Sequence, residues 1–441
     1  MSTTTISRAR AQEIIDALRR GTVPRASLDA FCVGLERFEA AVDADLEAVA
    51  SGRGVFKAVR GDYGCGKTFF TRWLADRARR KGFVTSEVQI SETETPLHKL
   101  ETVYRRLMER LATTDTPEGA LRNVVDGWFH VLEEDVLAEG AELDEAGLIA
   151  RTTALLENRL AAVSNQAPLF AAAIRGYRQA SVAGDRATAD GLLAWAAGQP
   201  HVAATAKRTA GIKGDLDHFG ALGFLQGVLT MLRDAGHSGL FVVLDEVETI
   251  QRVRSDARDK SLNALRQLID EVEGGRFPGL FLLITGTPAF YEGPQGIQRL
   301  EPLAQRLQVD FKTDARFDNP RAVQMRLPPF DIERLVKVGA KVRDIFASCA
   351  ASPDRITGTC NDAFVRRLAE GVAGKLGGKV GIAPRIYLKK LVADVLDRVD
   401  QFPEFDPLAH YTLTLADNEL NPVEREAAGA GGVDDIALDI K

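Results

Sequence analysis

The sequence has few cysteines and histidines for its length, and they are widely spaced. Its 441 residues include four cysteines and six histidines. The cysteines, Cys32, Cys65, Cys349 and Cys360, form no C-x-x-C pair, which is the spacing that zinc sites and dithiol motifs use. The pattern therefore argues against a structural zinc site and against a disulfide framework.

The chain also lacks long apolar runs and a large net charge. Its longest apolar runs, such as 240–244 and 280–284, are far shorter than the roughly 20 residues that cross a bilayer. The start, MSTTTISRARAQEI, has no apolar signal-peptide core. A net charge of −6 gives no global attraction to nucleic acid or to an anionic membrane, so any such contact must be local. We therefore expect a cytoplasmic protein without a membrane partner.

What the sequence does contain is a complete phosphate-binding loop. GDYGCGKT fills every fixed position of G-x-x-x-x-G-K-[ST]. An apolar strand pattern at 55–59 precedes it, and a helical pattern at 69–81 follows it. Backbone N–H groups at such a helix start stabilise polyphosphate. The residues expected to line the nucleotide are Gly61, Asp62, Tyr63, Gly64, Cys65, Gly66, Lys67, Thr68 and Phe69.

Within this loop, Lys67 is expected to reach the β- and γ-phosphates, and the Thr68 hydroxyl to hold Mg²⁺. Cys65 leaves two interpretations open. A thiol among loop amides has a lowered pKa at a helix start, or a small side chain is simply tolerated beside two glycines. The motif predicts ATP and Mg²⁺ as ligands.

A second apolar run, 240–244, ends in two acids. A continuous apolar run of this length is typical of a strand buried on both faces of a parallel sheet. Ligands bind at the carboxyl ends of such strands. We expect Asp245 to bind the water shell of Mg²⁺ and Glu246 to orient and deprotonate the attacking water. The alternative is a strand that merely ends in solvated acids.

A third apolar run, 279–284, is followed by Thr285. A hydroxyl at this strand tip is placed either to contact the γ-phosphate or its water, or to serve as a turn residue. Near the N-terminus, the Val33-Gly34 turn leads toward the loop strand. It either contacts the adenine base, with Val33 as the candidate residue, or belongs to a helical brace.

The chain divides into four predicted parts. Residues 1–50 form an N-terminal helical segment, and 51–330 form the nucleotide-binding core. The core is interrupted by an alanine-rich helical insertion at about 113–214. Residues 331–401 read as a helical lid domain, and 402–441 as an extension that ends in a flexible acidic tail.

One stretch of the predicted lid is basic. Between Arg366 and Lys390 there are seven basic residues and one acid. A solvated helix face explains this pattern, and so does a surface that contacts phosphates. The stretch from Lys207 to Lys213 is the other candidate for contacts with a DNA backbone.

Together these motifs resemble those of AAA+ ATPases, closest to the initiator branch related to Orc1 and Cdc6. The resemblance rests on GDYGCGKT, LFVVLDEVE, the polar residue after LFLLI, and Ala383-Pro384-Arg385. More narrowly, IIDALRRGTVP, FCVGLERFEAAVDADLEAV, GDYGCGKTFF and LPPFDIERL resemble BREX phage-defence ATP-binding proteins of the BrxD family.

The resemblance implies an α/β fold: an AAA+ parallel-sheet core with a large helical insertion and a C-terminal helical lid. It implies that Thr285 is the first sensor and that Arg385 is the second sensor, reaching from the lid to the γ-phosphate. Arg306 is the best candidate for an arginine finger given to a neighbouring subunit, with Arg299 in reserve. Only about forty residues follow Gln401, so we do not expect the C-terminal winged helix that is usual in the initiator branch.

The sequence thus predicts an ATP-hydrolysing AAA+ protein of BREX-type defence. We expect a homo-oligomer that contacts DNA phosphates and works with a helicase or other BREX components. The alternative is a nucleotide-gated switch or scaffold with little hydrolysis. A small-molecule kinase fits the paired acids and the lid arginine less well, and the chain lacks the Asn/Thr-Lys-x-Asp stretch of a GTPase.

Overall fold

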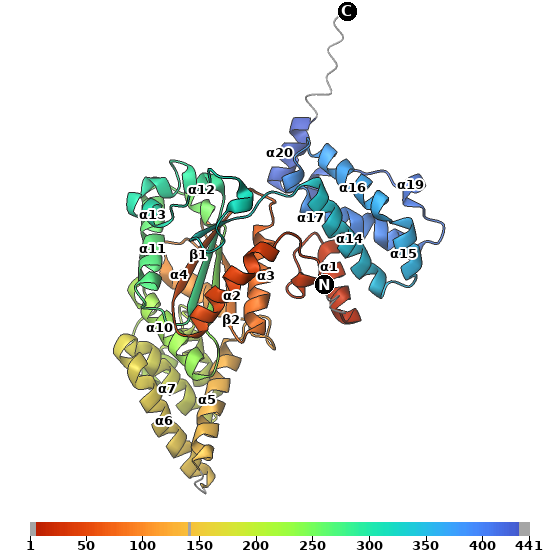
Figure 1. Ribbon diagram of the computed structural model, residues 1–441. Coiled ribbons are helices and arrows are strands. Elements are labelled where there is room, and N and C mark those ends of the chain that lie inside the picture. Colours follow the sequence, from red (N-terminus) through yellow and green to blue (C-terminus); the bar gives the residue numbers. More distant parts are fainter. Residues whose placement is uncertain (1–5, 140–142, 432–441) are drawn as a thin grey trace, which may run out of the picture.

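Five parallel strands form one sheet at the centre of the computed structural model, which describes residues 6–139 and 143–431 (Figure 1). Their order across the sheet is β2-β3-β4-β1-β5, and every neighbouring pair is parallel. The strands are β1 (Val55–Arg60), β2 (Val84–Gln89), β3 (Leu240–Asp245), β4 (Leu280–Gly286) and β5 (Gln324–Arg326). The predicted α/β class with a parallel sheet is confirmed.

Both faces of the sheet are covered, because its central strands are apolar at every position. All residues of β3 and β4 are buried. Val242 and Leu282 point into one apolar cluster, whereas Phe241 and Phe281 point into the other. Alternate side chains of a strand face opposite sides, so a continuous apolar run requires helices on both faces.

Five long helices provide most of this cover within the core. Apolar residues of α2 and α3 belong to the cluster that contains Phe241, and those of α4, α10 and α11 to the cluster that contains Val242. The helices are α2 (Glu36–Ala50), α3 (Lys67–Arg80), α4 (Leu100–Glu109), α10 (His218–Asp234) and α11 (Ser255–Glu273).

The helical insertion extends away from the sheet at the bottom of Figure 1. It packs on α10 and α4 through aromatic side chains, among them Phe170 and Trp195, whose rings lie edge-on to Phe224. Its apolar residues continue the cluster on that face of the sheet. The helices are α5 (Leu121–Ala138), α6 (Glu145–Gln166), α7 (Pro168–Val182), α8 (Arg186–Ala196) and α9 (Ala204–Thr209).

Short helices follow the ends of β3 and β4. A 3-10 helix, η2 (Val247–Arg252), begins two residues after Asp245. After β4 come α12 (Pro288–Glu292), the 3-10 turn η3 (Ile297–Arg299) and α13 (Glu301–Arg306). Pro288 and Pro302 lie in the first turns of α12 and α13, where the missing proline N–H costs no hydrogen bond.

The C-terminal helices form a separate group beside the sheet, drawn in blue in Figure 1. Lys390–Leu396 form a π-helical stretch between two of them. The helices are α14 (Ile332–Cys349), α15 (Pro353–Thr359), α16 (Asp362–Lys375), α17 (Pro384–Lys389), α18 (Asp397–Gln401), α19 (Pro407–His410) and α20 (Pro422–Gly431).

The N-terminal helix α1 (Arg8–Arg19) packs on this C-terminal group, whereas α2 packs on the sheet. Ile14, Ile15 and Leu18 of α1 are buried. Arg19 donates from Nε to Asp397 Oδ2 at 2.7 Å and from Nη2 to Asp397 Oδ1 at 2.8 Å. The first fifty residues therefore contribute one helix to each part.

Within the expected C-terminal extension, Pro422–Gly431 form the helix α20. Glu424 of this helix is buried and pairs with Arg385. The acidic residues Asp434, Asp435 and Asp439 of the expected tail lie outside the described residues. Within the described ranges, no helix combines the length and apolar character that crossing a membrane requires.

Close packing of α14 on α17 leads to a stability prediction. A Cβ added at Gly339 would overlap the Tyr387 hydroxyl and lie 2.8 Å from Tyr387 Cζ. We expect Gly339→Ala to lower the free energy of unfolding by about 1 to 3 kcal/mol through overpacking. A Cβ at Gly358 meets nothing within 4 Å, so Gly358→Ala should change it by less than about 1 kcal/mol. Denaturant unfolding checks both, and equal stabilities would contradict the packing described.

Candidate nucleotide-binding site

The phosphate-binding loop connects β1 to α3 at the carboxyl edge of the sheet. Gly64 and Gly66 have φ angles of 81° and 94°, a left-handed backbone that favours glycine. Gly66 directly precedes the first residue of α3. The loop backbone therefore leads into a helix N-terminus, the geometry that binds anions.

Lys67 is folded back into its own loop. Its Nζ donates to the carbonyl oxygens of Gly61 at 2.9 Å and Asp62 at 3.3 Å. The ammonium also lies 5.0 Å from the centre of the Tyr63 ring. Its side chain is 8% exposed, so these contacts replace the water that an exposed lysine would bind.

Thr285 joins the two acids at the end of β3. Its Oγ1 donates to Asp245 Oδ1 and accepts from the Glu246 N–H at 3.0 Å. The side chain of Thr285 is fully buried. The hydroxyl therefore orients the Asp245 carboxylate and contacts the backbone N–H of Glu246.

Glu246 leaves the strand in an unusual backbone conformation. Its φ is 59°, one of three positive values at non-glycine residues among those described. Such strain costs of order 1 to 3 kcal/mol and recurs at functional sites. The Glu246 carboxylate accepts a hydrogen bond from Gln89 Nε2 at 2.8 Å. Gln89 is the last residue of β2 and was not singled out by the sequence motifs.

A third acid, Glu248, faces the loop from the first turn of η2. Its side chain is 3% exposed, and Oε1 lies 3.9 Å from Lys67 Nζ. Neither carboxylate oxygen has a hydrogen-bond partner within the described structure. Burial raises the pKa of Glu248 to about 7, against the opposing effect of Lys67. Only the spacing E-x-E after the strand hinted at this residue.

Thr68 and Asp245 form the part of the site that suits a divalent cation. Thr68 Oγ1 donates to Asp245 Oδ2 at 3.3 Å. Hydroxyl and carboxylate oxygens are the ligands that Mg²⁺ prefers, usually in small number alongside waters and phosphate. The described residues contain no group of three or more His, Cys, Asp or Glu side chains that could hold a metal alone. The donor set therefore fits Mg²⁺ bound together with a nucleotide.

Aromatic side chains border the loop on the side of the N-terminal segment. The Phe31 and Phe69 rings meet edge to face at 5.2 Å. Phe330, at the start of the C-terminal group, would lie 3.7 Å from a Cβ placed on Gly66. Val33 is half-buried and packs against the apolar cluster that contains Phe31. These contacts give the candidate base-binding side an apolar character.

The three candidate arginines are all in ion pairs outside the loop. Arg306 pairs with Asp270, and Arg299 pairs with Asp259. Arg385 donates to Glu424 and, from Nη2, to the Glu419 carbonyl at 2.6 Å. Hydrogen bonds join Thr68, Asp245, Glu246 and Thr285 next to Lys67, whereas the arginines have their partners elsewhere.

Cys65 is a buried residue with an ordinary packing role. Its side chain is 5% exposed, and burial raises the pKa of its thiol to about 11. The interpretation of a lowered pKa is wrong, because desolvation outweighs the nearby Lys67 charge. A Cβ at Gly61 would overlap the Cys65 Sγ, which explains why glycine opens the loop.

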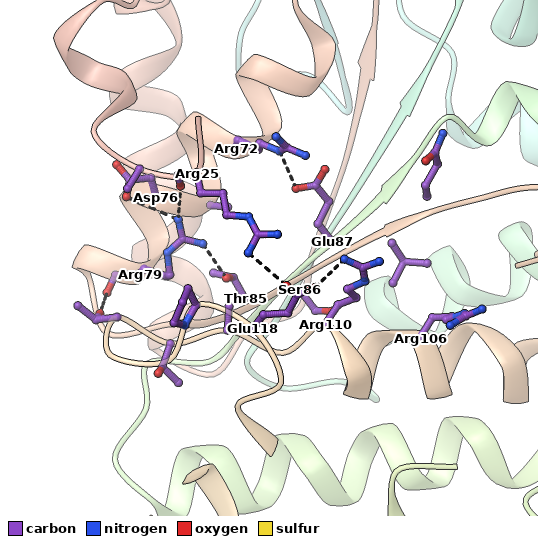
Figure 2. A pocket seen from close by; sticks show the side chains of 18 of the residues that line it. Arg25, Arg72, Asp76, Arg79, Thr85, Ser86, Glu87, Arg106, Arg110 and Glu118 are labelled. Atoms are coloured by element: carbon purple, nitrogen blue, oxygen red, sulfur yellow. Dashed lines mark hydrogen bonds and ion pairs between the residues drawn. The ribbon is translucent and has the colours of Figure 1, made fainter. Parts of the chain in front are cut away.

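A separate groove of about 540 Å³ runs along β2, one of the two edge strands of the sheet (Figure 2). Figure 2 shows Arg72 facing Glu87, and Arg25 and Arg110 reaching toward Glu118. Gln89 lines this groove as well, so one side chain borders both the groove and Glu246. The arginines of the lining are Arg10, Arg25, Arg72, Arg79, Arg80, Arg106 and Arg110, and the acids are Asp76, Glu87, Glu94 and Glu118.

A glycine loop after one strand, paired acids after a second and a hydroxyl after the strand between them define a P-loop nucleotide-binding protein of the AAA+ type. The chain belongs to the family described as BREX system ATP-binding protein BrxC/D, whose model matches residues 6–415. The expected family is thus confirmed, and with it an ATP-binding protein of the BREX defence system.

Among solved structures, the chain is similar to that of the Aeropyrum pernix ORC2 protein in ADPNP–ADP complexes. The two share 12% sequence identity over 86% of this chain and 70% of that one, with a TM-score of 0.33. The comparison with curated proteins gives no match.

The buried hydroxyl between the acids provides a test of the site geometry. Thr285→Val removes a hydrogen-bond donor to the Asp245 carboxylate and one of the two acceptors of the Glu246 N–H, which also donates to Asp245 Oδ1 at 3.1 Å. We expect the free energy of unfolding to fall by about 1 to 3 kcal/mol. Thr285→Ser keeps the hydroxyl and should lose less, about the value of one methyl group. Chemical denaturation checks the order, and a valine variant more stable than the serine variant would contradict it.

Proposed function

We propose that the protein hydrolyses ATP as an AAA+ motor or switch of the BREX system. The observation that carries the proposal is that both acids are held beside the phosphate-binding loop: Thr285 and Thr68 donate to the Asp245 carboxylate, and Gln89 donates to the Glu246 carboxylate. A fixed pair of acids is what hydrolysis of a bound nucleotide requires, because phosphoryl transfer depends on positioning and charge stabilisation.

The proposed roles follow from the geometry of each side chain. Lys67 and the loop amides bind the phosphates, as the motif requires. Thr68 and Asp245 hold Mg²⁺, which supplies positive charge at the phosphates when bound. Glu246 orients water and accepts its proton. Gln89 holds the Glu246 carboxylate at 2.8 Å, so release of this hydrogen bond frees Glu246 to act.

The arginines are proposed to complete the site only after rearrangement. Arg306 or Arg299 would leave its present ion pair and reach a neighbouring subunit, and Arg385 would leave Glu424 and turn to the γ-phosphate. An arginine finger contributes on the order of 10³ to 10⁵ in rate. We therefore propose a homo-oligomer as the active form, acting in the cytoplasm with a helicase or other BREX components.

A nucleotide-gated switch with little hydrolysis is the second candidate. It is favoured by the ion pairs that occupy all three arginines. Steady-state hydrolysis, measured alongside oligomer size with and without ATP and duplex DNA, separates the two candidates. Negligible turnover in every condition, together with a nucleotide-dependent change of shape, supports the switch.

The hydrolysis proposal predicts different losses at Glu246 and Lys67. Glu246→Gln keeps the size of the side chain but removes the base, so hydrolysis should fall by about 10² to 10⁴ while nucleotide binding remains. Lys67→Ala should lose nucleotide binding. Glu92→Gln, an exposed acid in the loop after β2, is the matched control and should match the wild type. Unchanged hydrolysis in Glu246→Gln would reject the catalytic assignment.

We propose the groove along β2 as the surface for DNA. Several of the basic residues expected to contact DNA are in ion pairs: Lys207 pairs with Asp215, Arg366 with Glu333, and Lys390 with Glu419. Six of the seven arginines of the groove are in ion pairs as well. What favours the groove is its excess of seven arginines over four acids, within a chain of net charge −6. Arginine binds phosphate oxygens through its planar fork of donors, and Gln89 would link an occupied groove to Glu246.

DNA binding through the groove predicts a specific change in salt dependence. Arg25→Ala combined with Arg110→Ala should weaken duplex binding about tenfold and lower the salt slope by about 2, since each phosphate contact contributes about 1. Lys375→Ala combined with Lys379→Ala, at exposed positions of the C-terminal group, is the control. Titrations by fluorescence anisotropy at several salt concentrations check this. If only the Lys375→Ala, Lys379→Ala variant loses DNA binding, the groove is rejected and the DNA-binding surface is assigned to the C-terminal group.

A further inference from the structure

Glu248 is the one acid of the site that the proposed mechanism does not use. Its carboxylate is 3% exposed, and neither oxygen accepts a hydrogen bond within the described structure. A buried charge without hydrogen bonds is costly. A residue in this position therefore depends on the nearest opposite charge, which is Lys67 Nζ at 3.9 Å.

The groups around Glu248 explain why Lys67 matters to it. Asp245 and Glu246 at the end of β3 repel its negative charge. The charge of Glu248 also acts on two tyrosines, Tyr63 in the loop and Tyr291 in α12: burial raises the pKa of each hydroxyl, and the Glu248 charge raises it further. Among the groups that act on Glu248, Lys67 at the start of α3 is the cation.

We propose that Glu248 is a positioning residue that holds Lys67 in the empty site, so that a nucleotide must break this ion pair in order to bind. The inference rests on the proposed nucleotide site. Lys67 now serves three partners: the Gly61 carbonyl, the Asp62 carbonyl and the Glu248 carboxylate. When Lys67 turns to the phosphates, the two uncharged carbonyl groups each lose a hydrogen bond, but the Glu248 carboxylate loses its counter-ion.

The cost of breaking this pair falls on Glu248, because η2 keeps the carboxylate buried. Bound phosphates add negative charge at the position that the lysine leaves, which disfavours the ionised carboxylate further. Glu248 then takes up a proton from solvent as the nucleotide binds. The pair thus sets the affinity of the site and couples nucleotide binding to one proton.

The sign of the pH effect follows from the two states. In the empty site the pKa of Glu248 is about 7, and in the occupied site it is higher. Below pH 7 the group is already protonated, and binding takes up no proton. Above pH 7 the empty site is ionised, so affinity falls as pH rises, by up to about tenfold per pH unit.

The test measures MgADP binding by titration calorimetry, which needs no hydrolysis. We expect Glu248→Gln to bind MgADP about tenfold more tightly than the wild type at pH 8 and about equally at pH 6, because the amide has no charge to neutralise. Glu92→Gln, which makes the same charge change at an exposed position, should bind as the wild type does. Comparing variants at one pH cancels the titration of the nucleotide itself.

A second measurement uses the wild type alone and stands even if the glutamine variant fails to fold. Titrations at pH 8 in two buffers with different ionisation enthalpies should show uptake of about one proton per MgADP. Equal affinities of wild type and Glu248→Gln at pH 8, weaker binding by the variant, or no proton uptake would overturn the inference while leaving the nucleotide site intact. Absence of MgADP binding in the wild type would overturn the proposed function and this inference together.

Discussion

The site depends on the way β4 pairs with both β1 and β3. Parallel pairing aligns Val59 with Thr285, and Leu244 with Ile284. The loop, the hydroxyl and the acids therefore leave the sheet at one edge, although more than 170 residues separate Thr68 from Asp245. The long insertion does not disturb this alignment, because it packs on α10 and α4, away from the sheet, while β2 and β3 on either side of it pair directly with each other.

The empty site is held together by internal pairing of its charges. Lys67 bonds to carbonyls of its own loop, Thr68 and Thr285 to Asp245, and Glu246 to Gln89. A ligand must then offer better partners than those it displaces, and a polyphosphate does so because it carries several charges at once.

Much of this arrangement could be predicted from local sequence. The buried strands are predicted by continuous apolar runs. The loop is predicted by its motif, in which Gly64 and Gly66 adopt the left-handed backbone that favours glycine. Glu248 could not be predicted, because only the 3-10 turn after Glu246 directs it inward. The partners of Arg306, Arg299 and Arg385 also depend on contacts between distant segments. Their roles as finger and sensor remain predictions, as do those of Lys67, Asp245 and Glu246.

The packing of α1 on the C-terminal group constrains the order in which the chain folds. Arg19 meets Asp397 across 378 residues, so the surface that covers the apolar face of α1 is complete only after those residues have been made. At roughly 5 to 20 residues per second, that interval is on the order of 20 to 75 s. During synthesis, α1 is therefore a natural segment for a chaperone to bind.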